Sequence, residues 1–167
     1  MKIRSIILSM MLVFGLSVPT YAKQTIGYSY NPNEETVFSP SNVAREKFNN
    51  PKGTWLSDGF LEISNPENGR IGIYAATFCH SPVDEIKTTI FIDQWDDETE
   101  DWNQVDYKSF TLTSENDGPL SEMILSFEVK GHEVNEWYRL RGLHVVYKGE
   151  DVEMFSTRTD GIEITKR

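Results

Sequence analysis

Short runs of alternating hydrophobic and polar residues fill the chain from Gly53 to its end, and turn residues separate them. The clearest run places Ile86, Thr88, Ile90 and Ile92 on one side of an extended segment. The runs cover residues 55–63, 71–79, 86–92, 105–112, 123–129, 137–147, 152–156 and 162–165. This pattern predicts an all-β fold, an antiparallel β-sandwich of about seven or eight strands. The lack of strand–helix–strand alternation argues against a doubly wound nucleotide-binding fold.

In the run at residues 105–112, the hydrophobic residues switch from one face of the predicted strand to the other. Val105 and Tyr107 share one parity, whereas Phe110 and Leu112 share the other. Because neighbouring strand residues point to opposite faces, the shift predicts a β-bulge near residues 108–109.

Residues 23–52 show neither a sustained strand period nor a sustained helix period. They are interpreted as an irregular N-terminal segment that precedes a β-sandwich domain at residues 53–167. Ser39 and Pro40 favour the start of a short helix over residues 42–48, although a helix of this length needs packing to be stable.

The N-terminus has the order of features of a secretory signal peptide. Lys2 and Arg4 precede an uncharged apolar stretch from Ile6 to Val18, and small residues lead up to Ala22. The stretch is shorter than the roughly 20 residues of a membrane-spanning helix. We expect residues 1–22 to be removed by cleavage after Ala22, which predicts a secreted, extracellular protein.

Charge narrows the range of partners. The predicted signal peptide carries two of the 16 basic residues and none of the 26 acidic ones, so its removal takes the formal net charge from −10 to −12. Such an acidic protein is not expected to bind nucleic acid, to attack anionic membranes or to insert stably into them. The length fits one domain with a core of its own.

Cys79 is the single cysteine, so no internal disulfide can form. Its place at the end of an apolar run favours a small core residue, while an intermolecular disulfide or a reactive thiol stays an alternative.

The densest acidic segment runs from Asp93 to Trp102 and holds six carboxylates between two predicted strands. Calcium binds several oxygen ligands on a turn, so weak Ca²⁺ binding is one interpretation. The segment lacks the spacing and the glycine of an EF-hand, and solvated charge at a hairpin tip is the preferred interpretation.

Two tryptophans flank this acidic segment and would face each other across a hairpin. Trp95 and Trp102, with Asp96 and Asp97 beside them, are the candidate ligand-binding residues, because paired indoles can stack on sugar rings while carboxylates accept hydrogen bonds from hydroxyls. The alternative is that the pair only stabilises the hairpin.

Catalytic chemistry is sparse. The histidines are His80, His132 and His144, and no two have a spacing that suggests a shared metal. Cys79 and His80 are strand neighbours that point to opposite faces, and His144 lies on the face opposite to its neighbours. Since no nucleophile, zinc-protease or phosphate-loop motif occurs, we expect no enzyme activity, no catalytic residue, no metal and no cofactor.

Several short motifs occur along the β-rich part of the chain. They are Gly53-Thr54-Trp55-Leu56 with Gly59, the strand from Ile71 to Cys79, Trp102 with Val105, Tyr138-Arg139-Leu140-Arg141-Gly142 with His144, and Thr159-Asp160-Gly161-Ile162. Together these motifs resemble an uncharacterised family, a domain of unknown function, of small secreted β-sandwich proteins from Gram-positive bacteria. The family often has a second cysteine four positions after Cys79, where this chain has Val83. The resemblance implies a secreted, non-catalytic β-sandwich and transfers no active site.

The sequence therefore predicts a non-catalytic extracellular binding or interaction module, with an extracellular protein or a glycan as its partner. A secreted antagonistic, bacteriocin-like or toxin-like protein is the alternative, and a secreted hydrolase is the third reading.

Overall fold

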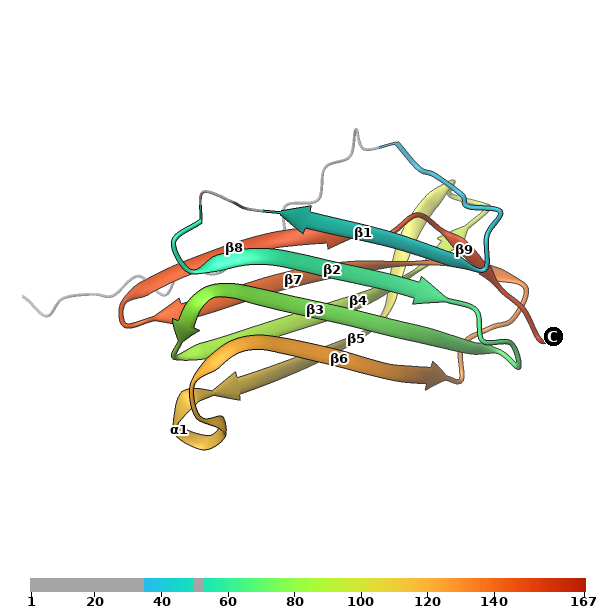
Figure 1. The fold of residues 1–167 in the computed structure, drawn as a ribbon. Coiled ribbons are helices and arrows are strands. Elements are labelled where there is room, and N and C mark those ends of the chain that lie inside the picture. The colour runs from blue at the N-terminus through green and yellow to red at the C-terminus, as the bar shows by residue number, and fades with distance from the viewer. Residues whose placement is uncertain (1–34, 50–52) are drawn as a thin grey trace, which may run out of the picture.

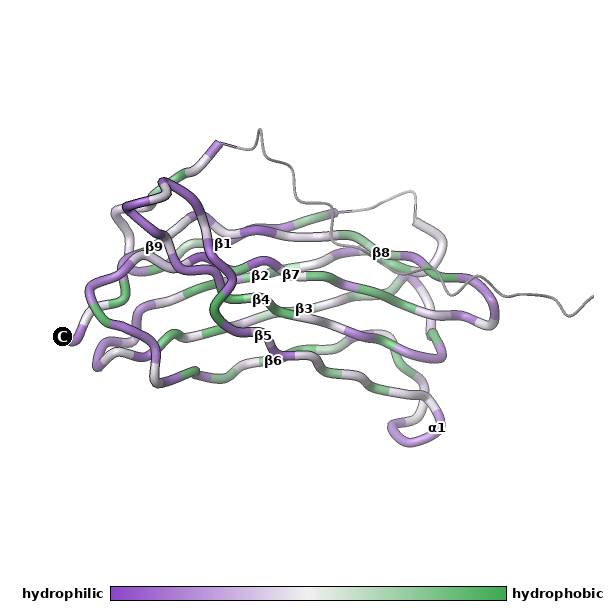
Figure 2. Tube along the Cα trace, turned by 180° about the vertical axis from the view of Figure 1, so that it is seen from behind, coloured by the Kyte–Doolittle hydropathy of each residue, from purple (hydrophilic) through white to green (hydrophobic). Residues whose placement is uncertain are grey.

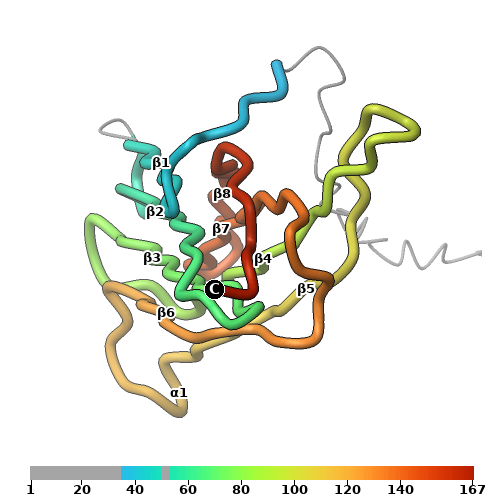
Figure 3. Tube along the Cα trace, turned by 90° about the vertical axis from the view of Figure 1, so that its right-hand side faces the viewer, coloured from blue at the N-terminus to red at the C-terminus, as the bar shows by residue number. Residues whose placement is uncertain are grey.

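The computed structural model describes residues 35–49 and 53–167, which form two antiparallel sheets packed face to face (Figures 1 and 3). The all-β sandwich predicted from the sequence is confirmed. The predicted signal peptide, residues 1–22, lies outside the described residues. Within the described part of the chain, no helix is long and apolar enough to cross a membrane.

Nine strands and one short helix make up the described fold. The four-stranded sheet has the order β1 (Val43–Asn49), β2 (Leu56–Ser64), β3 (Arg70–Val83) and β6 (Leu120–Lys130). The five-stranded sheet has the order β5 (Asp101–Thr113), β4 (Glu85–Asp96), β7 (Glu136–Lys148) and β8 (Asp151–Arg158), and β9 (Ile162–Ile164) also pairs with β7. The helix α1 (Ser114–Asp117) links β5 to β6, which lie in different sheets.

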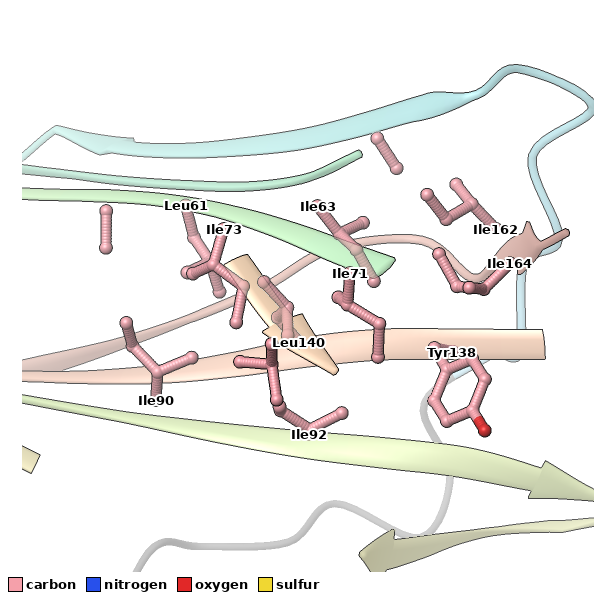
Figure 4. Packing of buried hydrophobic residues seen from close by; sticks show 13 residues of the cluster. Leu61, Ile63, Ile71, Ile73, Ile90, Ile92, Tyr138, Leu140, Ile162 and Ile164 are labelled. Atoms are coloured by element: carbon pink, nitrogen blue, oxygen red, sulfur yellow. The ribbon is translucent and has the colours of Figure 1, made fainter. Parts of the chain in front are cut away.

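The core follows directly from the alternation of the strands. Every second residue points between the sheets, so hydrophobic and hydrophilic positions alternate along the trace (Figure 2). Leu61, Ile63, Ile71 and Ile73 of one sheet meet Ile90, Ile92, Tyr138, Leu140, Ile162 and Ile164 of the other (Figure 4). A second hydrophobic cluster between the sheets comprises Leu56, Val83, Ile86, Leu120, Met123, Val146 and Phe155.

The N-terminal boundary of the sandwich differs from the sequence interpretation. Residues 43–49 were expected to be irregular, or a short helix from residue 42, but they form β1 along the edge of β2. The helix prediction is wrong because Ala44 and Phe48 pack inward while Arg45 forms an ion pair with Glu62 of β2. These partners are distant in the sequence, so local propensity could not show them.

The bulge predicted near residues 108–109 is absent, because β5 stays in register with β4 from Asp106 to Thr113. A bulge lies instead at an earlier position of β5. The pairing of β4 with β5 shifts between Ile92 and Asp93, which leaves Val105 as the extra residue of β5. The bulge therefore lies before Tyr107 and not at residues 108–109. Its effect is to turn Tyr107 to the outer face of the sheet, opposite Phe91.

A buried polar group lies between the sheets. His144 is fully buried, with its Nδ1 atom 2.7 Å from the Thr77 hydroxyl and its Nε2 atom 3.0 Å from the Thr157 hydroxyl, and Phe155 stacks on its ring. Burial lowers the pKa of His144 from 6.5 to about 4. The imidazole is thus a neutral, hydrogen-bonded part of the core.

The single cysteine is half-buried and contacts the second core cluster. Burial, with a smaller contribution from the Glu153 carboxylate, raises the pKa of the Cys79 thiol to about 11. The thiol is therefore protonated at neutral pH and is a poor nucleophile.

Candidate functional site

Aromatic, charged and hydroxyl-bearing side chains lie on the outer face of the five-stranded sheet. Its strand register aligns outward-pointing residues in rows across β5, β4, β7 and β8. In order from the β4–β5 hairpin, the rows are Trp102 and Trp95; Gln104, Asp93 and Arg139; Tyr107, Phe91, Arg141 and Arg158; Ser109, Thr89, Leu143 and Ser156; Thr111, Lys87, Val145 and Met154.

The two candidate tryptophans face each other as the sequence predicted. Trp95 and Trp102 are paired in the register of the hairpin, and their rings lie 5.4 Å apart, edge to face. Phe38, from the segment before β1, contacts both rings and also Trp137 of β7. The guanidinium of Arg139 lies 4.7 Å from the ring of Trp102, which is only 9% exposed. The ring of Trp102 is therefore engaged by its own chain.

The two candidate aspartates hold the hairpin turn, whose tip stands out from the rest of the sheet (Figure 3). Asp96 accepts hydrogen bonds from the backbone N–H groups of Glu98 and Thr99 and from the Asn103 side chain, and the backbone bonds lower its pKa most. Asp97 accepts a 2.8 Å bond from the indole N–H of Trp95. Both carboxylates thus have partners within the hairpin.

A shallow acidic hollow of about 440 Å³ lies beside the hairpin. Its lining comprises Gln94, Trp95, Asp96, Asp97, Glu98, Asn103, Val105, Glu133 and Glu136. In residues 35–49 and 53–167, no group of three or more histidine, cysteine or acidic side chains is arranged to hold a metal ion. The acidic residues lie close together without converging on a common point.

Next to the tryptophans, a buried carboxylate joins two arginines. Asp93 is 1% exposed and accepts a 3.1 Å bond from Nε of Arg139 and two bonds, of 2.7 and 2.8 Å, from Arg141. Arg141 also lies 5.0 Å from the ring of Phe91. Asp93 therefore holds two arginines that each lie over an aromatic ring, Arg139 over Trp102 and Arg141 over Phe91.

The rows beyond these arginines form a second hollow of about 400 Å³, which we name the sheet-face hollow. Its lining comprises Lys87, Thr89, Phe91, Tyr107, Ser109, Leu143, Val145 and Tyr147. Of these residues, Lys87 alone carries a charge. Tyr107 is 58% exposed, and the Thr89 and Ser109 hydroxyls lie 2.9 Å apart across the strands. The surface combines aromatic rings with hydroxyl groups.

The outer face of the other sheet has a different chemistry. Ion pairs cross it between Arg45 and Glu62 and between Arg70 and Glu128, as expected for a sheet surface in water. That face also has a hollow, of about 410 Å³, in which Tyr74 lies beside the carboxylates of Glu62 and Glu128. The sheet-face hollow differs from it because no carboxylate lines it.

The sequence interpretation did not single out the sheet-face hollow. Its one local signal lies in β7, where Leu143, Val145 and Tyr147 are apolar at outward positions while Leu140 and Val146 fill the inward ones. A strand with apolar residues on both faces is normally buried on both faces, by the core on one side and by another element or a ligand on the other. The alignment with Thr89 and Tyr107 arises only from the pairing of three strands.

No protein-family model matches the chain, and no curated protein matches it.

Proposed function

We propose that this protein is a non-catalytic extracellular binding module that holds an uncharged glycan across the sheet-face hollow. The observation that carries the proposal is the exposed Tyr107 ring beside paired Thr89 and Ser109 hydroxyls, in a hollow with a single charged residue.

Such a surface can bind both the apolar and the polar groups of a sugar. The C–H faces of a pyranose ring pack on aromatic side chains, and its hydroxyl groups exchange hydrogen bonds with threonine, serine and tyrosine hydroxyls. Tyr107 and Phe91 lie tilted to each other with ring centroids 6.4 Å apart, which offers an aromatic surface that is not flat. An uncharged ligand also avoids repulsion from the acidic surface of the protein.

The hollow is shallow and open, which suits a chain-like ligand that binds along a surface. The sequence interpretation centred on Trp95 and Trp102 as the stacking pair. The hollow supports the proposal better, because Trp102 is covered by Phe38 and Arg139 whereas Tyr107 is exposed.

Replacing Tyr107 with Ala is expected to weaken glycan binding about tenfold or more, since the lost ring packing amounts to at least about 1.4 kcal/mol. The measurement is isothermal titration calorimetry of residues 23–167 with uncharged oligosaccharides of glucose, mannose and N-acetylglucosamine.

Tyr74→Ala is the matched control, because Tyr74 lies on the outer face of the other sheet, against Phe60. This variant should bind the glycan like the wild type. If no uncharged oligosaccharide binds the folded protein, or if both variants lose affinity equally, the proposal fails.

A further inference from the structure

The segment before β1 occupies a site on the rest of the protein. Phe38 forms a parallel bridge with Gly161, in which the N–H of Ser39 donates to the Gly161 carbonyl (2.7 Å) and the N–H of Gly161 donates to the Val37 carbonyl (2.8 Å). The Phe38 side chain then enters the tryptophan cluster, and its ring centroid lies 4.9 Å from that of Trp137. Main-chain hydrogen bonds combined with one side chain in an aromatic site are a known mode of peptide recognition.

The site is shaped for a close backbone approach. A Cβ atom at position 161 would lie 2.7 Å from the ring of Trp102 and 3.3 Å from the ring of Phe38. Any side chain larger than that of Gly161 would therefore push the indole or the incoming ring away. Because Gly161 has no side chain, the backbone of residues 37–39 and the Phe38 ring can pack closely against it and against Trp102.

The present occupant leaves one polar group of the site unpaired. The Nε1 atom of Trp102 is buried and has no hydrogen-bond partner. A buried donor without an acceptor is unfavourable, so the contact of Phe38 with this site leaves the indole N–H unsatisfied. Phe38 itself is 39% exposed, and its segment precedes Pro40, outside the strands of the sandwich.

We propose that the site formed by Trp95, Trp102, Trp137 and Gly161 is a docking site for an extended peptide segment of a partner protein that carries an aromatic side chain. In the present structure Phe38 holds this site in cis, and the chemistry of Phe38 defines the chemistry of the partner. The bridge to Gly161 supplies the backbone contacts, and the indole cluster selects the aromatic residue. The proposal does not depend on glycan binding at the sheet-face hollow.

Occupation in cis has a measurable consequence. A partner peptide must displace Phe38, so its apparent affinity for the wild type is reduced by the fraction of molecules in which Phe38 fills the site. Removing the Phe38 ring should raise the affinity for an added peptide. It should also expose the indoles and shift their fluorescence emission to longer wavelength.

The experiment uses the Phe38→Ala variant of residues 23–167 and two synthetic peptides. One peptide has the sequence of residues 35–41, Glu-Thr-Val-Phe-Ser-Pro-Ser, and the other has alanine in place of its phenylalanine. We expect the phenylalanine peptide to bind this variant saturably, to restore the wild-type emission, and to bind at least tenfold more tightly than the alanine peptide. Its affinity for the wild type should be lower than its affinity for the variant.

Two further variants complete the test. Circular dichroism and the denaturation midpoint report whether Phe38→Ala folds, and Phe38→Leu replaces it if it does not. Adding Gly161→Ala to either variant should abolish peptide binding, because the new methyl group meets Trp102. Equal affinity for both peptides in a folded variant, or binding that survives Gly161→Ala, would overturn the proposal.

Discussion

Replacing Asp93 with Ala is expected to lower the free energy of unfolding by about 3–5 kcal/mol. The substitution removes the carboxylate that accepts hydrogen bonds from the buried side chain of Arg139 and the nearly buried side chain of Arg141, and its one negative charge is then lost beside two positive charges. An unpaired buried charge is costly, because the low-dielectric surroundings replace neither its hydration nor its counter-ion. Urea denaturation, followed by circular dichroism, measures the effect as a lower midpoint.

Glu98→Ala removes the same charge from an exposed position at the tip of the hairpin and is the control. Its effect should stay within about 0.5 kcal/mol of the wild type. If Asp93→Ala proved as mild as this control, the carboxylate would not be the group that holds the two arginines. The large effect should also be accompanied by a change in tryptophan emission, since Arg139 lies against Trp102.

Lowering the pH from 6.5 to 4.5 is expected to destabilise the protein by about 2–3 kcal/mol through His144 alone. The folded-state pKa of His144 is about 4, below its ordinary value of 6.5, so the unfolded chain binds more protons in this interval. The contribution is fully present above pH 6.5 and is lost progressively as the pH falls toward 4. Urea midpoints measured at half-unit steps of pH give this slope.

The His144→Gln variant separates this contribution from that of the carboxylates. An amide can still exchange hydrogen bonds with Thr77 and Thr157 but does not titrate, so the slope between pH 6.5 and 4.5 should become shallower. The lowered pKa values of Asp84 and Asp106 act mainly below that interval. An unchanged slope in the variant would show that His144 is not the titrating group.

Much of the sandwich could be predicted from the sequence, because side-chain alternation is a local property of a strand. The period-2 runs at Ile71, Ile73 and Ala75 and at Ile86, Ile90 and Ile92 lie in β3 and β4, and all six side chains are buried between the sheets. The facing pair Trp95 and Trp102 was also predictable, since the two residues flank one turn symmetrically.

The sequence-based predictions were wrong where contacts with residues distant in the sequence determine the local structure. The segment at residues 43–49 has weak alternation, with Glu46 between Ala44 and Phe48, and it becomes a strand because β2 offers an edge. The position of the bulge at Val105 was likewise set by the pairing of β5 with β4, and not by the parity of the hydrophobic residues alone.

The class of the fold, the pattern of the core strands and the absence of an internal disulfide follow from the amino-acid sequence. The candidate sites follow from the three-dimensional fold: Phe38 contacts tryptophans more than 50 residues away, and Tyr107, Thr89 and Leu143 share one surface although they come from three strands. The physical reason is that alternation is encoded within a strand, whereas a surface row depends on which strands pair and in which register.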